Sequence, residues 1–203
     1  MPYRPEHKEK THRRIVDSAA GEFRTHGFEG VGIAKLMGAL ELTHGGFYAH
    51  FADREALVAE ACVAALDQSR EALIAGLAAG GFPAVITYYL SEEQRDHPAS
   101  ACLLPSLAAE VARRPVSSRD AFTERLSEIF HELAVHMPGQ TPAQRFEKVC
   151  VLFSSMVGAM SLARAVSDPV MSRTLLHTTR EQLLRFIAEA ESGADPSVPE
   201  KQL

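Results

Sequence analysis

The sequence lacks the features of a membrane or secreted protein. No run approaches the roughly 20 consecutive apolar residues that a transmembrane helix needs, so no membrane span is expected. The first residues are polar and contain no apolar core of the kind found in a secretory signal. Cysteine is scarce: Cys62, Cys102 and Cys150 lie far apart, which excludes a disulfide framework and a CxxC metal site. We therefore expect a cytoplasmic protein.

An excess of positive charge is also missing. The 203 residues include 21 Lys and Arg against 26 Asp and Glu, a net charge of −5, which by itself argues against a nucleic acid as partner. The balance is uneven, however, because residues 1–52 hold seven basic and six acidic side chains, whereas residues 53–203 hold fourteen and twenty. The N-terminal quarter is thus the part suited to face a polyanion.

What the sequence does have is helical periodicity. Ile15, Ala19 and Phe23 recur at four-residue spacing and predict a helix over 6–26, which Gly27 is placed to end in a left-handed conformation. No segment shows alternating strands around a hairpin turn. Further helices are expected over 32–40, 43–48, 54–79, 83–94, 101–113, 118–136, 142–166 and 169–191.

The predicted fold is therefore all-α, with about nine helices. A three-helix head over 1–52 is followed by a larger helical domain over 53–191. The last residues, 192–203, contain glycine and prolines and are expected to be a disordered tail.

The segment from Gly30 to Phe51 contains the most informative pattern. Two short helices joined by a three- to four-residue turn form a helix-turn-helix, whose second helix enters a DNA major groove. Gly45 leaves room for a close approach to the backbone, and Thr43 can cap the second helix beside a phosphate. Side chains that can donate hydrogen bonds to DNA are Lys35, Thr43, His44, Tyr48 and His50.

The run Thr43–Phe51, followed by Ala52–Leu57, resembles the recognition helix and the following helix of the TetR/AcrR transcriptional regulators. The resemblance extends from about Arg13 to Ala61. It implies a homodimeric, ligand-responsive DNA-binding protein, usually a repressor of a pseudo-palindromic operator, with no catalytic activity and no cofactor. By position in the motif, the DNA contacts implied by the family are Thr43, His44, Gly45, Tyr48, His50 and, for a phosphate, Arg54.

The resemblance also implies how the larger domain works. The helices over 142–166 and 169–191 would pair with those of a second subunit, and both are apolar over wide arcs. An unidentified small molecule would bind in this domain, or a thiol would be modified. The candidate ligand-binding or sensing residues are Cys102, Tyr88, Tyr89, Phe122, His131 and Phe153.

Glu41 departs from the family pattern. Relatives usually have glycine at this position of the turn, where the backbone often needs a positive φ that is uncommon for glutamate. The negative charge of Glu41 would also lie close to the path of a DNA phosphate. We therefore expect that glutamate at this position weakens DNA binding.

Two other functions are compatible with the sequence. A small helical enzyme would draw its active site from Cys102, Glu110, His131 and His136, although no pattern identifies a nucleophile with its base. A TetR-like protein that binds another protein in place of DNA is the second alternative. The spacing Glu128-x-x-His131 occurs in di-iron bundles, but no facing glutamates accompany it, so no metal site is predicted.

Overall fold

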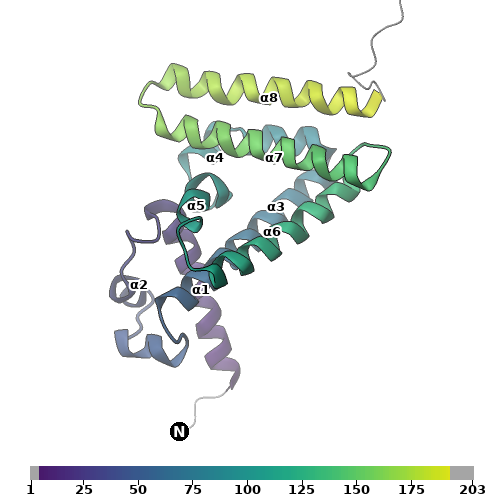
Figure 1. Ribbon diagram of the computed structural model, residues 1–203. Helices are drawn as coiled ribbons and strands as arrows, with labels where there is room; N and C mark the ends of the chain where they lie inside the picture. Colours follow the sequence, from purple (N-terminus) through teal and green to yellow (C-terminus); the bar gives the residue numbers. More distant parts are fainter. Residues whose placement is uncertain (1–4, 193–203) are drawn as a thin grey trace, which may run out of the picture. The chain divides into compact units, whose positions relative to one another are not determined.

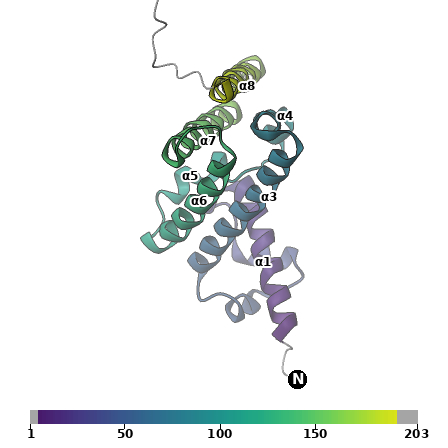
Figure 2. The same cartoon turned by 90° about the vertical axis from the view of Figure 1, so that its right-hand side faces the viewer.

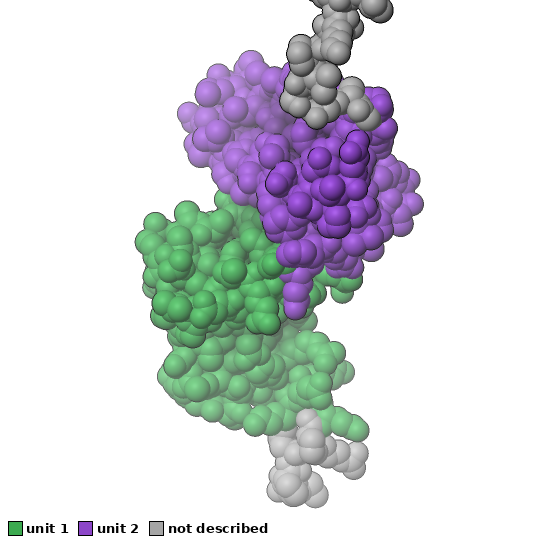
Figure 3. Space-filling model, turned by 45° about the vertical axis from the view of Figure 1, so that its right-hand side comes forward, with its two compact units in different colours: residues 1–71, 97–127 green, residues 72–96, 128–203 purple. Residues whose placement is uncertain are grey.

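A computed structural model describes residues 5–192 of the chain, and over these residues every regular element is a helix (Figure 1). The predicted all-α fold with about nine helices is thereby confirmed. The chain divides into two compact units, coloured separately in Figure 3. Unit 1 contains residues up to Glu71 together with His97–Ser127, and unit 2 contains Ala72–Asp96 together with the residues from Glu128 onward. Except for Ser192, the predicted tail lies outside the described residues.

Unit 1 begins with the three helices of the head. These are α1 (Pro5–His26), α2 (Ile33–Ala39) and the 3₁₀ helix η1 (His44–Ala49). Gly27 ends α1 as predicted, with φ of 72° and its N–H donating to Phe23 O at 2.9 Å. The apolar side chains buried between these helices are Ile15, Ala19, Phe23, Phe28, Leu36, Met37 and Phe47.

The next helix, α3 (Arg54–Tyr89), is interrupted where the two adjacent glycines lie. Asp53 caps its first turn by accepting the Ala56 N–H at 2.8 Å. Gly80 (φ 179°, ψ 29°) and Gly81 (φ 67°, ψ −162°) leave helical geometry, as the sequence predicted for this point. The positive φ of Gly81 explains why glycine is needed there.

The prediction of a single helix over 83–94 was wrong at the C-terminal end of that range. The second part of α3 ends at Tyr89, and a separate helix, α4 (Glu92–Asp96), begins after Ser91. The hydroxyl of Ser91 accepts the Gln94 N–H at 3.2 Å, so a side-chain cap starts a new helix where the apolar pattern predicted a continuous one.

Unit 1 also includes α5 (Leu104–Val111), and α6 (Val116–His136) begins within it. The predicted helix over 101–113 is therefore shorter than expected at both ends. Cys102 lies ahead of its first turn.

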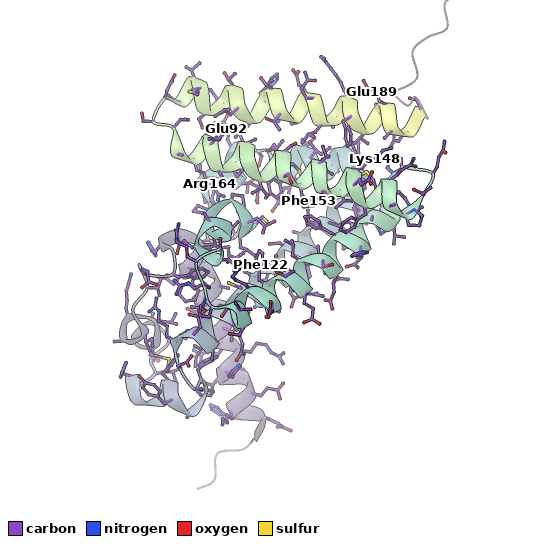
Figure 4. All side chains as sticks on the ribbon, viewed as in Figure 1. Glu92, Phe122, Lys148, Phe153, Arg164 and Glu189 are labelled. Atoms are coloured by element: carbon purple, nitrogen blue, oxygen red, sulfur yellow. The ribbon has the colours of Figure 1, made fainter. Side chains whose placement is uncertain are left out.

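Unit 2 contains the two long helices α7 (Pro142–Ala165) and α8 (Pro169–Ser192), which run side by side in opposite directions (Figures 1 and 2). Thr141 starts α7 with a reciprocal cap: its hydroxyl accepts the Gln144 N–H, and the Gln144 side chain accepts the Thr141 N–H. Near the other end of α7, the guanidinium of Arg164 donates to the last carbonyls of α4, including Gln94 O at 2.6 Å (Figure 4).

Two helices are more apolar than the sequence analysis recognised. By length and composition alone, α3 and α7 could cross a membrane, and 28% and 39% of their most apolar windows are buried inside the chain. Such helices also occur as core helices of soluble proteins. The incomplete burial of α7 leaves apolar surface on the outside of unit 2.

The compact units divide the chain differently from the predicted boundary at residue 52. The first half of α3, α5 and the first half of α6 belong to the same unit as the head. Polar contacts explain this grouping, because Arg24 in α1 donates to Ala101 O at 2.9 Å and Phe28 N–H donates to Glu110 in α5 at 2.8 Å. Neither contact leaves a pattern in the sequence.

Candidate nucleic-acid interface

The predicted cap of the second helix of the helix-turn-helix is present. The Thr43 hydroxyl oxygen accepts the Gly46 N–H at 3.2 Å, and Thr43 itself has extended backbone geometry with φ of −77° and ψ of 148°. The helix that follows, η1, is a 3₁₀ helix of six residues. Because the Thr43 oxygen acts as acceptor in the cap, its hydroxyl proton is left to donate outward from this exposed position.

The turn between α2 and η1 has the positive-φ backbone geometry that the family resemblance led us to expect at this position. Glu41 has φ of 60°, the positive value predicted for this position, and its side chain is exposed. The turn is tight, with the Glu41 N–H donating to Gly38 O at 3.0 Å and the Leu42 N–H donating to Met37 O at 2.9 Å. A left-handed conformation costs an L-residue about 1–2 kcal/mol relative to glycine.

One side of η1 forms an exposed edge with an aromatic side chain at its centre. The Tyr48 side chain is 61% exposed. The ring of His44 meets it edge-on at 6.0 Å between centroids, and the buried ring of Phe47 meets it edge-on at 5.3 Å. These contacts hold the tyrosine ring outward from the head, where it is available to a partner.

Gly45 lies on the same edge and has no structural reason to be glycine. A Cβ added at Gly45 would meet nothing within 4 Å, and the residue is exposed without a positive φ. Glycine within a helix costs about 0.5–1 kcal/mol relative to alanine. Packing within the chain therefore does not explain the glycine at this position.

Lys35 is on the surface of α2, and its ammonium lies 3.9 Å from Glu22. Since its side chain is 69% exposed, this distant ion pair leaves the lysine able to reach other partners. The predicted DNA contact of Lys35 is compatible with its position.

Arg54 is held differently from what its predicted phosphate contact requires. Its guanidinium donates to Val31 O at 2.8 Å and to Phe28 O, and its Nε is buried without a hydrogen-bond partner among the described residues. Arg54 thus binds the loop that connects α1 to α2. This geometry favours a structural role for Arg54 over the phosphate contact that the family resemblance implies.

His50 closes η1 and lies beside α1. Its ring centroid is 5.9 Å from that of His12, and its Nδ1 is buried with no hydrogen-bond partner in the described part of the chain. Burial, followed by the nearby His12 and Lys8, lowers the pKa of His50 below its usual value. His50 is therefore neutral at pH 7 in the free protein.

The predicted ligand-binding residues do not form one group. Tyr89 and Phe153 are buried together in unit 2, with ring centroids 6.5 Å apart, and Phe130 extends this aromatic cluster at 5.1 Å from Phe153 (Figure 4). Tyr88 is half exposed, and the His131 ring lies against Phe146 at 4.5 Å. The remaining two candidates, Cys102 and Phe122, belong to unit 1.

All three cysteines are free thiols, of which Cys62 is buried and Cys102 and Cys150 are half-buried. Cys62 is buried in α3, and burial together with Glu55 raises its pKa to about 12 despite the opposing effect of Arg114. Cys102 is half-buried in unit 1. Its neighbour Ala101 accepts a hydrogen bond from the buried Arg24.

Sequence analysis missed the polar contacts that join α5 to the head. Glu110 accepts the Phe28 N–H, and a Cβ added at Gly27 would meet the Glu110 carboxylate at 2.5 Å. Arg114 pairs with Glu29 at 2.7 Å and lies 4.7 Å above the Phe28 ring. Gly27, Glu29, Glu110 and Arg114 are among the residues that line a surface pocket of about 370 Å³. In the sequence, Gly27 is explained by its position at the end of a helix, so it does not indicate the contact with Glu110.

Comparisons with known proteins identify a family similar to the head in sequence and solved structures similar to the chain in fold. The sequence profile of the bacterial regulatory proteins of the tetR family matches residues 15–61. No curated protein matches the chain. Among solved structures, a TetR transcriptional regulator from Chloroflexus aurantiacus is similar, with a TM-score of 0.71 and 23% identity over 91% of this chain and 97% of that one.

Two further solved structures are similar to this chain. The reduced form of Escherichia coli NemR has a TM-score of 0.67 and 18% identity, over 87% of this chain and 96% of that chain. RolR in complex with resorcinol has a TM-score of 0.57 and 19% identity, over 98% of this chain and all of that one. At these identities the similarity concerns the fold.

The cysteine environments predict different reactivities. In the native protein at pH 8, a maleimide or iodoacetamide is expected to label Cys102 and to leave Cys62 unmodified, because the Cys62 thiol is buried and stays protonated. Mass spectrometry of peptides after labelling gives the result. The variants Cys102→Ser and Cys62→Ser identify each modified position, and labelling of Cys62 without denaturant would contradict the prediction.

Proposed function

We propose that this chain, a TetR-family transcriptional regulator by its N-terminal domain and its fold, is a homodimeric repressor that leaves a pseudo-palindromic operator when an effector binds. The observation that carries the proposal is the exposed edge of η1, where Thr43, His44, Gly45 and Tyr48 are on the surface. This edge lies within the segment that matches the family profile. The function includes no catalytic step.

The exposed edge suits a DNA major groove. The Tyr48 hydroxyl can donate to a phosphate oxygen, and its ring can lie against a thymine methyl group. Gly45 allows the backbone of η1 to come close to the base edges. Thr43, His44, Lys35 and His50 supply further donors around this centre, and we infer that they contact phosphates or bases.

The outer side of α7 is suited to a second copy of the chain. Val151, Ser154, Gly158 and Leu162 are all exposed and recur at three- and four-residue spacing, so they share one side of the helix. Val151 and Leu162 are 52% and 54% exposed, which is unusual for large apolar side chains. A Cβ added at Gly158 would meet nothing within 4 Å, so a close helix from the partner explains this glycine.

We infer that α7 and α8 of two subunits form the dimer interface. Such an isologous contact repeats the same patch on both subunits. It would set the spacing of the two heads, which must be about 34–36 Å, or one helical turn of DNA, to bind successive major grooves.

Two kinds of effector fit the proposal. A small apolar molecule could bind beside the aromatic cluster of Tyr89, Phe130 and Phe153 in unit 2, since ligand sites are mostly apolar with a few polar groups. Alternatively, an electrophile or oxidant could modify Cys102, whose neighbour Ala101 is hydrogen-bonded to α1 through Arg24. Either effector acts only if it binds or modifies the DNA-free state more readily.

Selection of bound sequences from a random DNA library tests the proposed function directly. Enrichment of a pseudo-palindrome whose half-sites lie about one helical turn apart supports the head, the dimer and the spacing together. Binding to the selected DNA must weaken steeply as salt rises, because phosphate contacts release counterions. Enrichment of no sequence, or binding without a salt dependence, would overturn the proposal.

Glu41 is expected to weaken DNA binding through its charge and to strain the turn through its φ. Glu41→Gly should tighten operator binding and raise the free energy of unfolding by about 1 kcal/mol. Glu41→Gln removes the charge and keeps a side chain at φ of 60°, so it should tighten binding without the gain in stability. Fluorescence anisotropy and urea unfolding separate the two effects. An unchanged or weaker affinity of Glu41→Gly would refute the charge argument.

Gly45→Ala tests the approach of DNA to η1. The added methyl group contacts nothing within the chain, so the substitution should raise the free energy of unfolding by about 0.5–1 kcal/mol. At the same time, operator affinity should fall about tenfold or more, a loss of about 1.4 kcal/mol. Gly38→Ala, at an equally open and exposed position of α2, is the matched control and should keep its affinity. Equal affinities of the two variants would show that Gly45 is not at the DNA.

The dimer interface is tested at Gly158. A leucine at this position should separate the subunits and give a monomer in sedimentation velocity, with unchanged helix content by circular dichroism, because its side chain clashes only with a partner. The variant should also lose tight binding to a two-half-site operator. Ala109→Leu, on the exposed side of α5, serves as control and should remain dimeric. A dimeric Gly158→Leu would locate the interface elsewhere.

A further inference from the structure

Two histidine rings and one phenylalanine ring meet where η1 ends against α1. The His12 ring is stacked on the ring of Phe51 at 4.5 Å between centroids, and the His50 ring lies 5.9 Å from His12. His12 Nε2 also lies 2.6 Å from the carboxylate of Glu60 in α3. His12 therefore connects α1 to α3 and fixes the surroundings of His50.

The two histidines have different partners for a proton. When protonated, His12 has the Glu60 carboxylate as its counter-charge. His50 has no such partner, because its Nδ1 is buried without an acceptor among the described residues. The two groups whose charge lowers the pKa of His50 are both basic, Lys8 and His12 of α1, and the Glu60 carboxylate of α3 lies against His12. A proton on His50 is thus disfavoured in the free protein.

We propose that His12 is a positioning residue for operator binding and that it makes this binding take up a proton at His50. The inference rests on the proposed DNA contact of His50. A phosphate beside the exposed part of the His50 ring supplies the negative partner that the chain itself does not provide. The bound state then favours protonated His50, and the free state favours the neutral ring.

Linkage sets the sign of the effect. A complex that binds one more proton than the free protein becomes more stable as pH falls, by at most about tenfold in affinity per pH unit. Because His12 lowers the pKa of His50 in the free protein, His50 is left to take up its proton when the operator binds. Replacing His12 by phenylalanine keeps the stack on Phe51 and removes the charge, so the rise in affinity should begin at a higher pH.

Folding stability responds to His50 in the opposite direction. Since its pKa is lower in the folded chain than the usual value of 6.5, the unfolded chain takes up the proton first as pH falls. The contribution of His50 to stability is therefore lost as pH falls from its pKa in the unfolded chain through its lower pKa in the folded chain. A gain in affinity at low pH is consequently not a by-product of a more stable head.

The experiment measures operator affinity by fluorescence anisotropy at pH 6, 7 and 8 and constant ionic strength. The wild-type protein should bind about threefold tighter or more at pH 6 than at pH 8. His50→Gln should lose this pH dependence, and His12→Phe should move it to higher pH. His136→Gln, which removes an exposed histidine at the end of α6, outside the proposed DNA contacts, is the control and should keep the dependence.

The outcomes are distinct from those of the proposed function. A wild-type affinity that does not change between pH 6 and 8 overturns the inference, as does a pH dependence that persists in His50→Gln or vanishes in His136→Gln. A pH profile of His12→Phe identical to that of the wild type removes the role of His12. If no operator is bound at any pH, it is the proposed function that fails. Thermal unfolding of each variant verifies that the head is folded.

Discussion

The buried guanidinium of Arg24 is the contact on which the arrangement of unit 1 depends. Arg24 is 5% exposed, and its nitrogens donate to Ala20 O at 3.0 Å, to Ala101 O at 2.9 Å and to the side chain of Gln68. All three acceptors are neutral, and burial lowers the pKa of the group, an effect that the nearby Cys102 opposes. Because an unpaired buried charge is very costly, α1, α3 and the segment before α5 must stay together.

The exposed edge of η1 and the turn before it belong to the same unit, and each contains a residue that lowers local stability. Glu41 occupies a left-handed backbone position, and Gly45 weakens a helix in which alanine would fit. Neither residue improves folding. Sites where local rules are broken without a structural benefit are the places where function is expected, and here two of them lie within one short segment.

Local patterns predicted most of the fold. Gly27, Thr43, Asp53 and Thr141 each mark a helix boundary that the structure reproduces, because capping depends on neighbours within four residues. The long-range contacts could not be predicted. Arg54 has the sequence position of a phosphate contact but binds carbonyls of the loop after α1, and the link between Glu110 and Phe28 joins residues 82 positions apart. For the same reason, composition does not reveal which of the candidate aromatic side chains pack together.

The contacts of α5 with the loop after α1 have a consequence for protein engineering. Glu110 accepts the Phe28 N–H, and Arg114 covers the ring of the same residue. In a hybrid protein made by joining a foreign head at residue 52, Glu110 and Arg114 would still be arranged to contact Gly27 and Phe28. Because residues up to 71 and 97–127 form one compact unit, we expect an exchange of both stretches together to preserve these contacts.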